Sequence, residues 1–156
     1  MDLKTKLAPN FTFGELTSTS REAFLEVNRR EALAYLEAGK ALAAMMQVVR
    51  DHFNSKVIVH SGFRGPALNK AIGGSKTSQH MLFQACDFHV EGFTLRQVFD
   101  WIRKSSGLKY GQVILEGHTP GAPPSWVHLS LGEPWREASK CRQQMTFDGS
   151  KYTTVP

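Results

Sequence analysis

The sequence predicts an α+β fold, with helices mainly in the first half of the chain and mostly antiparallel strands in the second half. A long amphipathic pattern that ends at Phe53 predicts the main helix, and short apolar runs after it predict strands. Near the C-terminus, Asp148-Gly149 is typical of a hairpin turn. The 156 residues, 41% of them hydrophobic, suffice for one buried core and are too few for two ordinary domains. We therefore expect a single domain over residues 1–156.

The first third of the chain is expected to be helical. Residues 10–16 would lead into the fold and dock two phenylalanines, Phe11 and Phe13. A helix beginning near residue 21 or 28 and ending at residue 53 is expected because apolar residues recur at steps of three, four or seven. They are Leu33, Leu36, Ala43, Met46, Val49 and Phe53. Gly39 is expected to loosen the middle of this helix.

Short strands and helices alternate in the middle of the chain. Apolar and β-branched runs predict strands at 56–60, 85–90, 110–116 and 126–131. Pro66 can begin a short helix to residue 71, and Thr94 can cap a helix to about residue 105. Glycines with small polar residues or prolines predict loops at 73–77 and 117–124. The tail, 133–156, carries the predicted hairpin.

Charge and composition exclude several classes of protein. The net charge of +5 is scattered along the chain, so binding to nucleic acid is not expected. No stretch reaches the roughly 18–20 apolar residues that span a bilayer, and no secretory signal is evident. We expect a monomer that is made in the cytoplasm, does not insert into membranes, and must be released to reach any substrate outside the cell. Cys86 and Cys141 lack metal-type spacing and need not pair.

Asp87 is the first candidate for metal binding, because it lies in an apolar strand where a carboxylate is costly unless it is paired or bound to a cation. His80 could join it only if a loop, rather than a continuous helix, connects them, since seven helical residues would separate them by about 10.5 Å. The alternative is an ion pair of Asp87 with Arg64 or a lysine. On this strand Cys86 faces the other way, whereas His89 shares the face of Asp87 and is a fallback ligand.

His128 and Glu116 lie on the two later strands. If these strands pair symmetrically about their loop, Glu116 faces Trp126 and is the diagonal neighbour of His128, about 7–8 Å away. A register slip of one residue would place them on opposite faces. Ligands of the His/Asp/His type leave a fourth position for water, as in catalytic zinc sites, and a nearby carboxylate can move its proton. Glu116 is the candidate base, although an ordinary solvated glutamate is the alternative.

Arg64 follows the first predicted strand directly. Its planar guanidinium could bind a carboxylate or the oxyanion of a reacting carbonyl. The alternative is a surface arginine with no role in chemistry.

Taken together, these pieces resemble the LAS family of zinc peptidases, which includes D-Ala-D-Ala carboxypeptidases and dipeptidases and the L-alanyl-D-glutamate endopeptidases of phage endolysins. The hedgehog signalling domain shares the metal core of that family. The similarity runs from about residue 11 to residue 131. The matching residues are, in order, Ser61-Gly62-Phe63-Arg64, Asn69, Gly73-Gly74-Ser75, Ser78-Gln79-His80, Ala85 with Asp87, residues 111–116, and Trp126 with His128 and Ser130.

The resemblance implies a hedgehog/DD-peptidase-like fold, a small sheet packed against N-terminal helices. It implies zinc bound by His80, Asp87 and His128. By the same resemblance Glu116 is the general base, Arg64 assists the substrate carbonyl, and Ser78 touches the substrate. The chain departs from the family at two positions: Phe83 stands where glycine is usual, and Ser125 where several branches carry the catalytic acid.

The implied activity is hydrolysis of a peptide bond in the stem peptide of bacterial peptidoglycan, by a phage or prophage lysin that acts on the wall or periplasm after release. The alternative is a non-catalytic zinc-binding structural or virion protein on the same scaffold. Which bond is cut, the host, and the role of the 133–156 tail are left open by the sequence.

Overall fold

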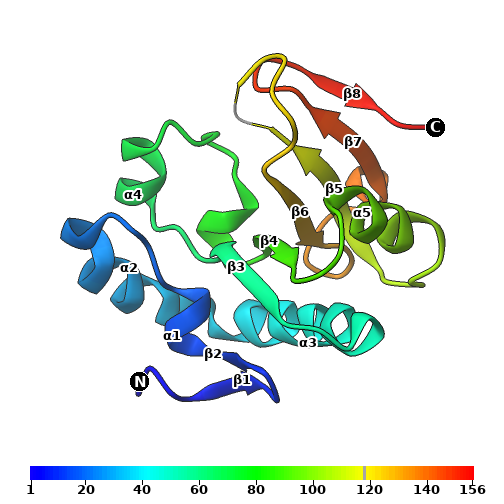
Figure 1. Ribbon diagram of the computed structural model, residues 1–156. Coiled ribbons are helices and arrows are strands. Elements are labelled where there is room, and N and C mark those ends of the chain that lie inside the picture. Colours follow the sequence, from blue (N-terminus) through cyan, green and yellow to red (C-terminus); the bar gives the residue numbers. More distant parts are fainter. Residues whose placement is uncertain (118) are drawn as a thin grey trace.

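The computed structural model describes residues 1–117 and 119–156, and it has an α+β architecture (Figure 1). Within these residues six strands form one sheet in the order β3-β4-β6-β5-β7-β8. Their bounds are β3 Val57–Ser61, β4 Ala85–Val90, β5 Tyr110–Glu116, β6 Trp126–Leu131, β7 Gln143–Phe147 and β8 Tyr152–Thr154. All neighbouring pairs are antiparallel except β5 and β7, which are parallel. The predicted α+β class and mostly antiparallel sheet are confirmed.

The helices occur largely where the sequence predicts them. The two short ones, α4 (Pro66–Ala71) and α5 (Leu95–Lys104), begin with the expected Pro66 and with a capping box at Thr94. The long helix is wrong as a single element, because a 3-10 turn at Glu22–Phe24 precedes α2 (Leu25–Ala32) and a second one at Leu33–Tyr35 separates α2 from α3 (Leu36–Phe53). Further short helical segments are α1 Phe13–Leu16, η3 Gln79–Leu82 and η4 Ala138–Lys140.

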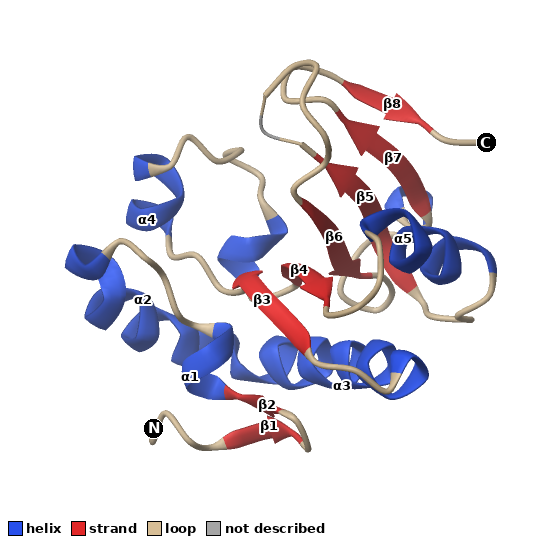
Figure 2. Cartoon of the chain, in the orientation of Figure 1, coloured by secondary structure: helices blue, strands red, loops and turns tan. Residues whose placement is uncertain are grey.

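The hydrophobic core lies between the sheet and two helices, α3 and α5, which Figure 2 shows in blue beside the red strands. Both helices contact β4 and β6. By length and composition alone the helical run Glu22–Phe53 could cross a membrane, but residues such as Leu42 and Met46 on α3 are buried in this core. Strand residues Cys86, Phe88, Val127, Leu129 and Val113 point toward these helices. Their neighbours therefore project from the opposite face of the sheet.

The N-terminal segment packs as expected, since Phe11 and Phe13 are 1% and 2% exposed. A two-stranded sheet, β1 (Lys6–Ala8) with β2 (Phe11–Thr12), was not predicted. Strands as short as these two, of three and two residues, carry too little pattern to be recognised in a sequence.

The C-terminal tail extends the main sheet. β7 and β8 form the predicted hairpin around Asp148-Gly149, where Gly149 has a φ of 93°. The Asp148 carboxylate accepts hydrogen bonds from the backbone N–H of Lys151 and from the hydroxyl and backbone N–H of Ser150, which lower its pKa to about 2. β7 also pairs with β5, so the tail is part of the sheet that carries the candidate site. The predicted loop over 117–124 includes residue 118, which lies outside the described residues.

Candidate metal centre

Three buried side chains converge on the face of the sheet opposite α3 and α5. Asp87 on β4 pairs directly with His128 on β6, and His80 reaches them from η3. His128 Nδ1 lies 2.8 Å from Asp87 Oδ1, and His80 Nε2 lies 3.2 Å from the same oxygen. The two histidine nitrogens are 3.3 Å apart. The sequence singled out these residues from separate motifs, and the fold places their donor atoms in one triangle.

This triangle fits a zinc ion. Zinc binds imidazole nitrogen and carboxylate oxygen at about 2.0–2.2 Å in tetrahedral geometry, which separates two ligand atoms by roughly 3.3 Å. Two edges of the triangle, 3.2 Å and 3.3 Å, match that separation, and the third, at 2.8 Å, needs only a small widening. His80, Asp87 and His128 form the group of metal-type donors found in the described part of the chain.

His80 is held in the form that a metal requires. Its Nδ1 lies 2.7 Å from the backbone oxygen of Gly62, and a carbonyl oxygen can only accept, so Nδ1 carries the proton. Burial lowers the pKa of His80, against the opposing effect of Asp87, and so favours the neutral ring. The lone pair of Nε2 therefore faces the other two donors, an arrangement typical of metal-bound histidine.

Asp87 is available as an anionic ligand. Burial alone would raise its pKa, but the neighbouring imidazoles of His80 and His128 hold the pKa well below its ordinary value. Arg64 Nη1 lies 3.8 Å from the second carboxylate oxygen. The ion pair considered as an alternative is thus present beside the donor triangle, and it leaves Oδ1 to the two histidines.

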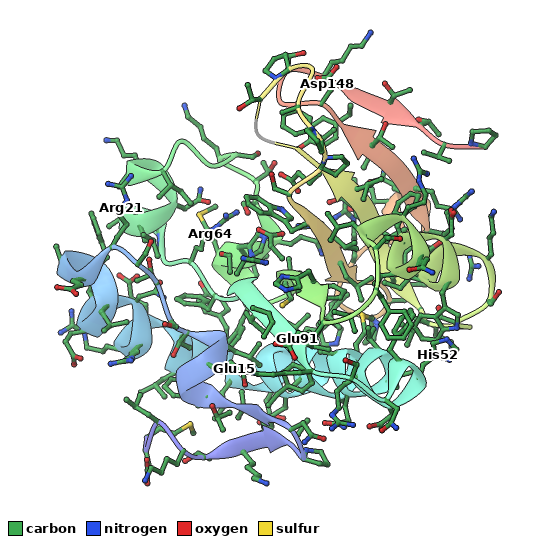
Figure 3. The ribbon with its side chains drawn as sticks, in the orientation of Figure 1. Glu15, Arg21, His52, Arg64, Glu91 and Asp148 are labelled. Carbon is green, nitrogen blue, oxygen red and sulfur yellow. The ribbon has the colours of Figure 1, made fainter. Side chains whose placement is uncertain are left out.

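Arg64 comes from the loop after β3 and lies beside the centre (Figure 3). Its backbone N–H donates to the backbone oxygen of His80, and its Nη2 donates to Ser78 Oγ at 3.3 Å. Ser78 Oγ also accepts from the backbone N–H of His80. These contacts join the arginine, the serine and the first histidine of the sequence motifs into one hydrogen-bonded unit.

Glu116 ends β5 in the register assumed from the sequence. Glu116 pairs with Trp126 and Ile114 pairs with His128, so Glu116 is the diagonal neighbour of His128 on the same face. It is partly buried rather than fully solvated. Burial raises its pKa and Asp87 adds to the rise, while His128, Trp126 and Arg64 oppose it. Glu116 therefore lies within the electrostatic field of the centre.

The remaining candidates fall outside the donor triangle. Cys86 is fully buried in the core, as alternation along the strand predicted. His89 pairs with His60, with 2.7 Å between His89 Nδ1 and His60 Nε2. Ser125 donates its backbone N–H to Glu116 O and supports the end of β5.

Phe83 does not narrow the site. Its backbone has a φ of 58°, the left-handed conformation that favours glycine. The ring is fully buried and packs against Phe63 at a centroid distance of 5.5 Å and against Gly39 of α3. The expectation that Gly39 loosens the helix is thus replaced by a packing role, because the missing Cβ makes room for this ring.

Asn28 is a buried residue that sequence reasoning missed. Its Nδ2 donates to the backbone oxygens of Thr17 and Phe63 at 3.0 and 3.1 Å, and its Oδ1 accepts from the backbone N–H of Gly65 at 2.7 Å. It therefore holds the loop that presents Arg64 and the Gly62 carbonyl. The sequence did contain one signal for it. Asn28 precedes the buried Ala32 of α2 by four residues, so both residues lie on the same, buried face of the helix.

Fold and donor set together define a metal-dependent hydrolase site, with two histidines, one carboxylate and a second carboxylate nearby. A family model described as peptidase M15 matches residues 9–120, well over half of the chain. The chain therefore belongs to the peptidase M15 family, a family of metallopeptidases. The matched region contains His80, Asp87 and Glu116, whereas His128 follows it. No curated protein matches the chain.

Proposed function

We propose that this protein is a zinc-dependent peptidase that hydrolyses a peptide bond in the stem peptide of bacterial peptidoglycan. The convergence of the His80, Asp87 and His128 donor atoms carries the proposal, because a set of three such donors leaves the fourth position of a tetrahedral zinc for water, as in catalytic zinc sites. Membership in the peptidase M15 family supports it. The arrangement is in keeping with the hedgehog/DD-peptidase scaffold, and a lysin released at the end of a phage cycle is the setting we favour.

A zinc ion bound here would make water nucleophilic near neutral pH and polarise the scissile carbonyl. Glu116 is the group in this chain that accepts a proton from the attacking water and delivers it to the leaving amine. Its position diagonal to His128 brings it to the edge of the centre, and its raised pKa suits a group that must both take up and release a proton.

Arg64 and Ser78 act on the substrate side of the centre. Asp87 and Ser78 hold two of the guanidinium nitrogens of Arg64, which fixes the plane of the group. The remaining N–H donors can then stabilise negative charge that develops on the substrate carbonyl oxygen. Ser78 orients Arg64 and, through the backbone of His80, the first metal ligand.

The alternative, a non-catalytic zinc-binding protein on the same scaffold, would be favoured if the bulky side chain of Phe83 covered the donor triangle. That ring packs into the core against Phe63 and Gly39 and does not block the donor triangle. Catalysis is therefore the function that the geometry supports best.

The test measures zinc content and hydrolysis of purified cell walls on the same samples. We expect one zinc per chain in the wild type, and loss of both zinc and activity in His80→Ala. Glu116→Gln should keep zinc and lose roughly 10²–10⁴-fold in rate. His60→Ala, a histidine outside the triangle, is the matched control and should retain zinc.

Zinc without hydrolysis of any wall type would favour the non-catalytic alternative. Absence of zinc would contradict the metal site. Unchanged activity in Glu116→Gln would remove Glu116 from the mechanism.

A further inference from the structure

Arg136, in the segment between β6 and β7, is a partly buried cation with neutral neighbours. Its Nη1 donates to the side-chain oxygen of Gln79, and its Nη2 donates to Gln143 Oε1 at 3.3 Å. Its Nε is buried and has no hydrogen-bond partner in the described part of the chain. None of the ion pairs among the described residues includes Arg136. A partly buried charge is costly without a counter-ion, so this arrangement is incomplete by itself.

The surroundings hold the Arg136 side chain in place. Gly111 on β5 lacks a side chain where one would collide, since a Cβ there would lie 3.0 Å from Arg136 Cδ and 3.0 Å from Ser130 Oγ. The stem of the arginine therefore lies close against the sheet.

The two amide groups that receive the guanidinium are oriented by other contacts. Gln112 Nε2 donates to Gln143 Oε1 at 2.8 Å, and Gln79 Nε2 donates to the backbone oxygen of Leu131 at 3.3 Å. Both amide oxygens are therefore turned toward Arg136. The guanidinium is positioned before any ligand arrives, which reduces the entropy lost on binding.

This cation is on the same face of the sheet as the metal centre. Arg136 Cδ and Ser130 Oγ both border the space beside Gly111, and Ser130 is two residues from His128 on β6, a spacing of about 6.6–6.8 Å on one face. Gln79, which receives Nη1, directly precedes His80. Along β5, Gln112 and Glu116 are on either side of Ile114, the partner of His128. The donor triangle thus lies between Glu116 and the Arg136 cluster.

We infer that Arg136 binds a free carboxylate group of the substrate peptide, next to the bond held at the metal centre. This inference rests on the proposed peptidase function and adds to it a preference for acidic over amidated substrates. A carboxylate satisfies a guanidinium with two parallel hydrogen bonds and supplies the missing counter-charge. Stem peptides offer such groups at the terminal D-alanine and on D-isoglutamate. Arg64 is a poorer receptor, because Asp87 already faces its guanidinium.

Binding of four synthetic stem pentapeptides to the zinc-loaded Glu116→Gln protein tests the inference. The peptides carry a C-terminal acid or amide, combined with D-isoglutamate or D-isoglutamine. We expect the acid form at one of the two positions to bind about 10–100-fold more tightly than its amide, as charged hydrogen bonds predict. Adding Arg136→Gln should abolish that preference by weakening the acid form alone, and Arg136→Lys should restore part of it.

Arg142→Gln is the matched control, because it removes the same charge from an exposed position in the same tail and should keep the preference. Equal affinity of acid and amide forms for the parent protein would overturn the inference. A preference for the acid peptide that survives Arg136→Gln would also overturn the inference. So would an equal loss of affinity for acid and amide peptides in that variant, because it would show that Arg136 has only a structural role. Failure of the zinc-loaded protein to bind any of the four peptides would overturn the proposed function together with this inference.

Discussion

The contact between Gly39 and Phe83 allows a double-mutant test of how this chain accommodates an aromatic residue beside its metal centre. A Cβ added at Gly39 would lie 2.6 Å from Phe83 Cε1 and 2.7 Å from Phe83 Cδ1. The ring is fully buried and packs on Phe63, so it has no open space to enter. Gly39→Ala should therefore be destabilising, although alanine is the better helix former.

The expected change in the free energy of unfolding follows from two opposing contributions. Overpacking a core costs about 1–3 kcal/mol, whereas glycine to alanine within a helix gains about 1 kcal/mol, so Gly39→Ala should lose up to roughly 2 kcal/mol. Phe83→Ala should lose about 3–5 kcal/mol by removing the ring. With the ring gone, Gly39→Ala should become stabilising by about 1 kcal/mol. The expected coupling is therefore about 1–3 kcal/mol.

Urea unfolding of the zinc-loaded wild type, both single variants and the double variant measures this coupling. Zinc content is the control, since neither residue belongs to the donor triangle. Phe83→Gly adds a check, because the φ of 58° at this position should make it about 1 kcal/mol more stable than Phe83→Ala. Additive effects, with Gly39→Ala destabilising in both backgrounds, would refute the proposed fit between ring and helix.

Three further predictions concern a residue that supports the centre, its candidate base, and the two cysteines. Asn28→Ala should destabilise the protein by about 3 kcal/mol or more, because three buried backbone groups lose their partner, and it should weaken zinc binding; an unchanged unfolding curve and zinc affinity would contradict this. Activity should fall as pH drops through the raised pKa of Glu116, since the base must be ionised, and Trp126→Phe should move this acid limb of the kcat/KM profile to higher pH. If the acid limb of the kcat/KM profile lies at the same pH in Trp126→Phe as in the wild type, Glu116 is not the titrating group. Because burial raises the pKa of the Cys86 thiol, iodoacetamide should modify Cys141 before Cys86 in the native protein, as mass spectrometry of peptides would show.

Several elements were predictable because their signals are local. Thr94 caps α5 through contacts within four residues, and Pro66 begins α4 because its ring suits the first turn of a helix. The strands β4, β5 and β6 have the predicted bounds, since apolar runs between turn residues specify them. The motifs around His80 and His128 singled out the donors for the same reason: each residue sits in a short recognisable segment.

The tertiary structure decided what depends on contacts between distant segments. The parallel pairing of β7 with β5 is not encoded by either strand alone, and it brings the tail beside the metal face. Asn28 and Gly39 look unfavourable in a helix until their partners, a loop near Arg64 and the ring of Phe83, are in place. Local sequence thus determined which residues could bind a metal, while packing and non-local hydrogen bonds determined how they are held. The physical reason is that burial and close approach depend on the whole fold, whereas caps, turns and alternation depend only on neighbouring residues.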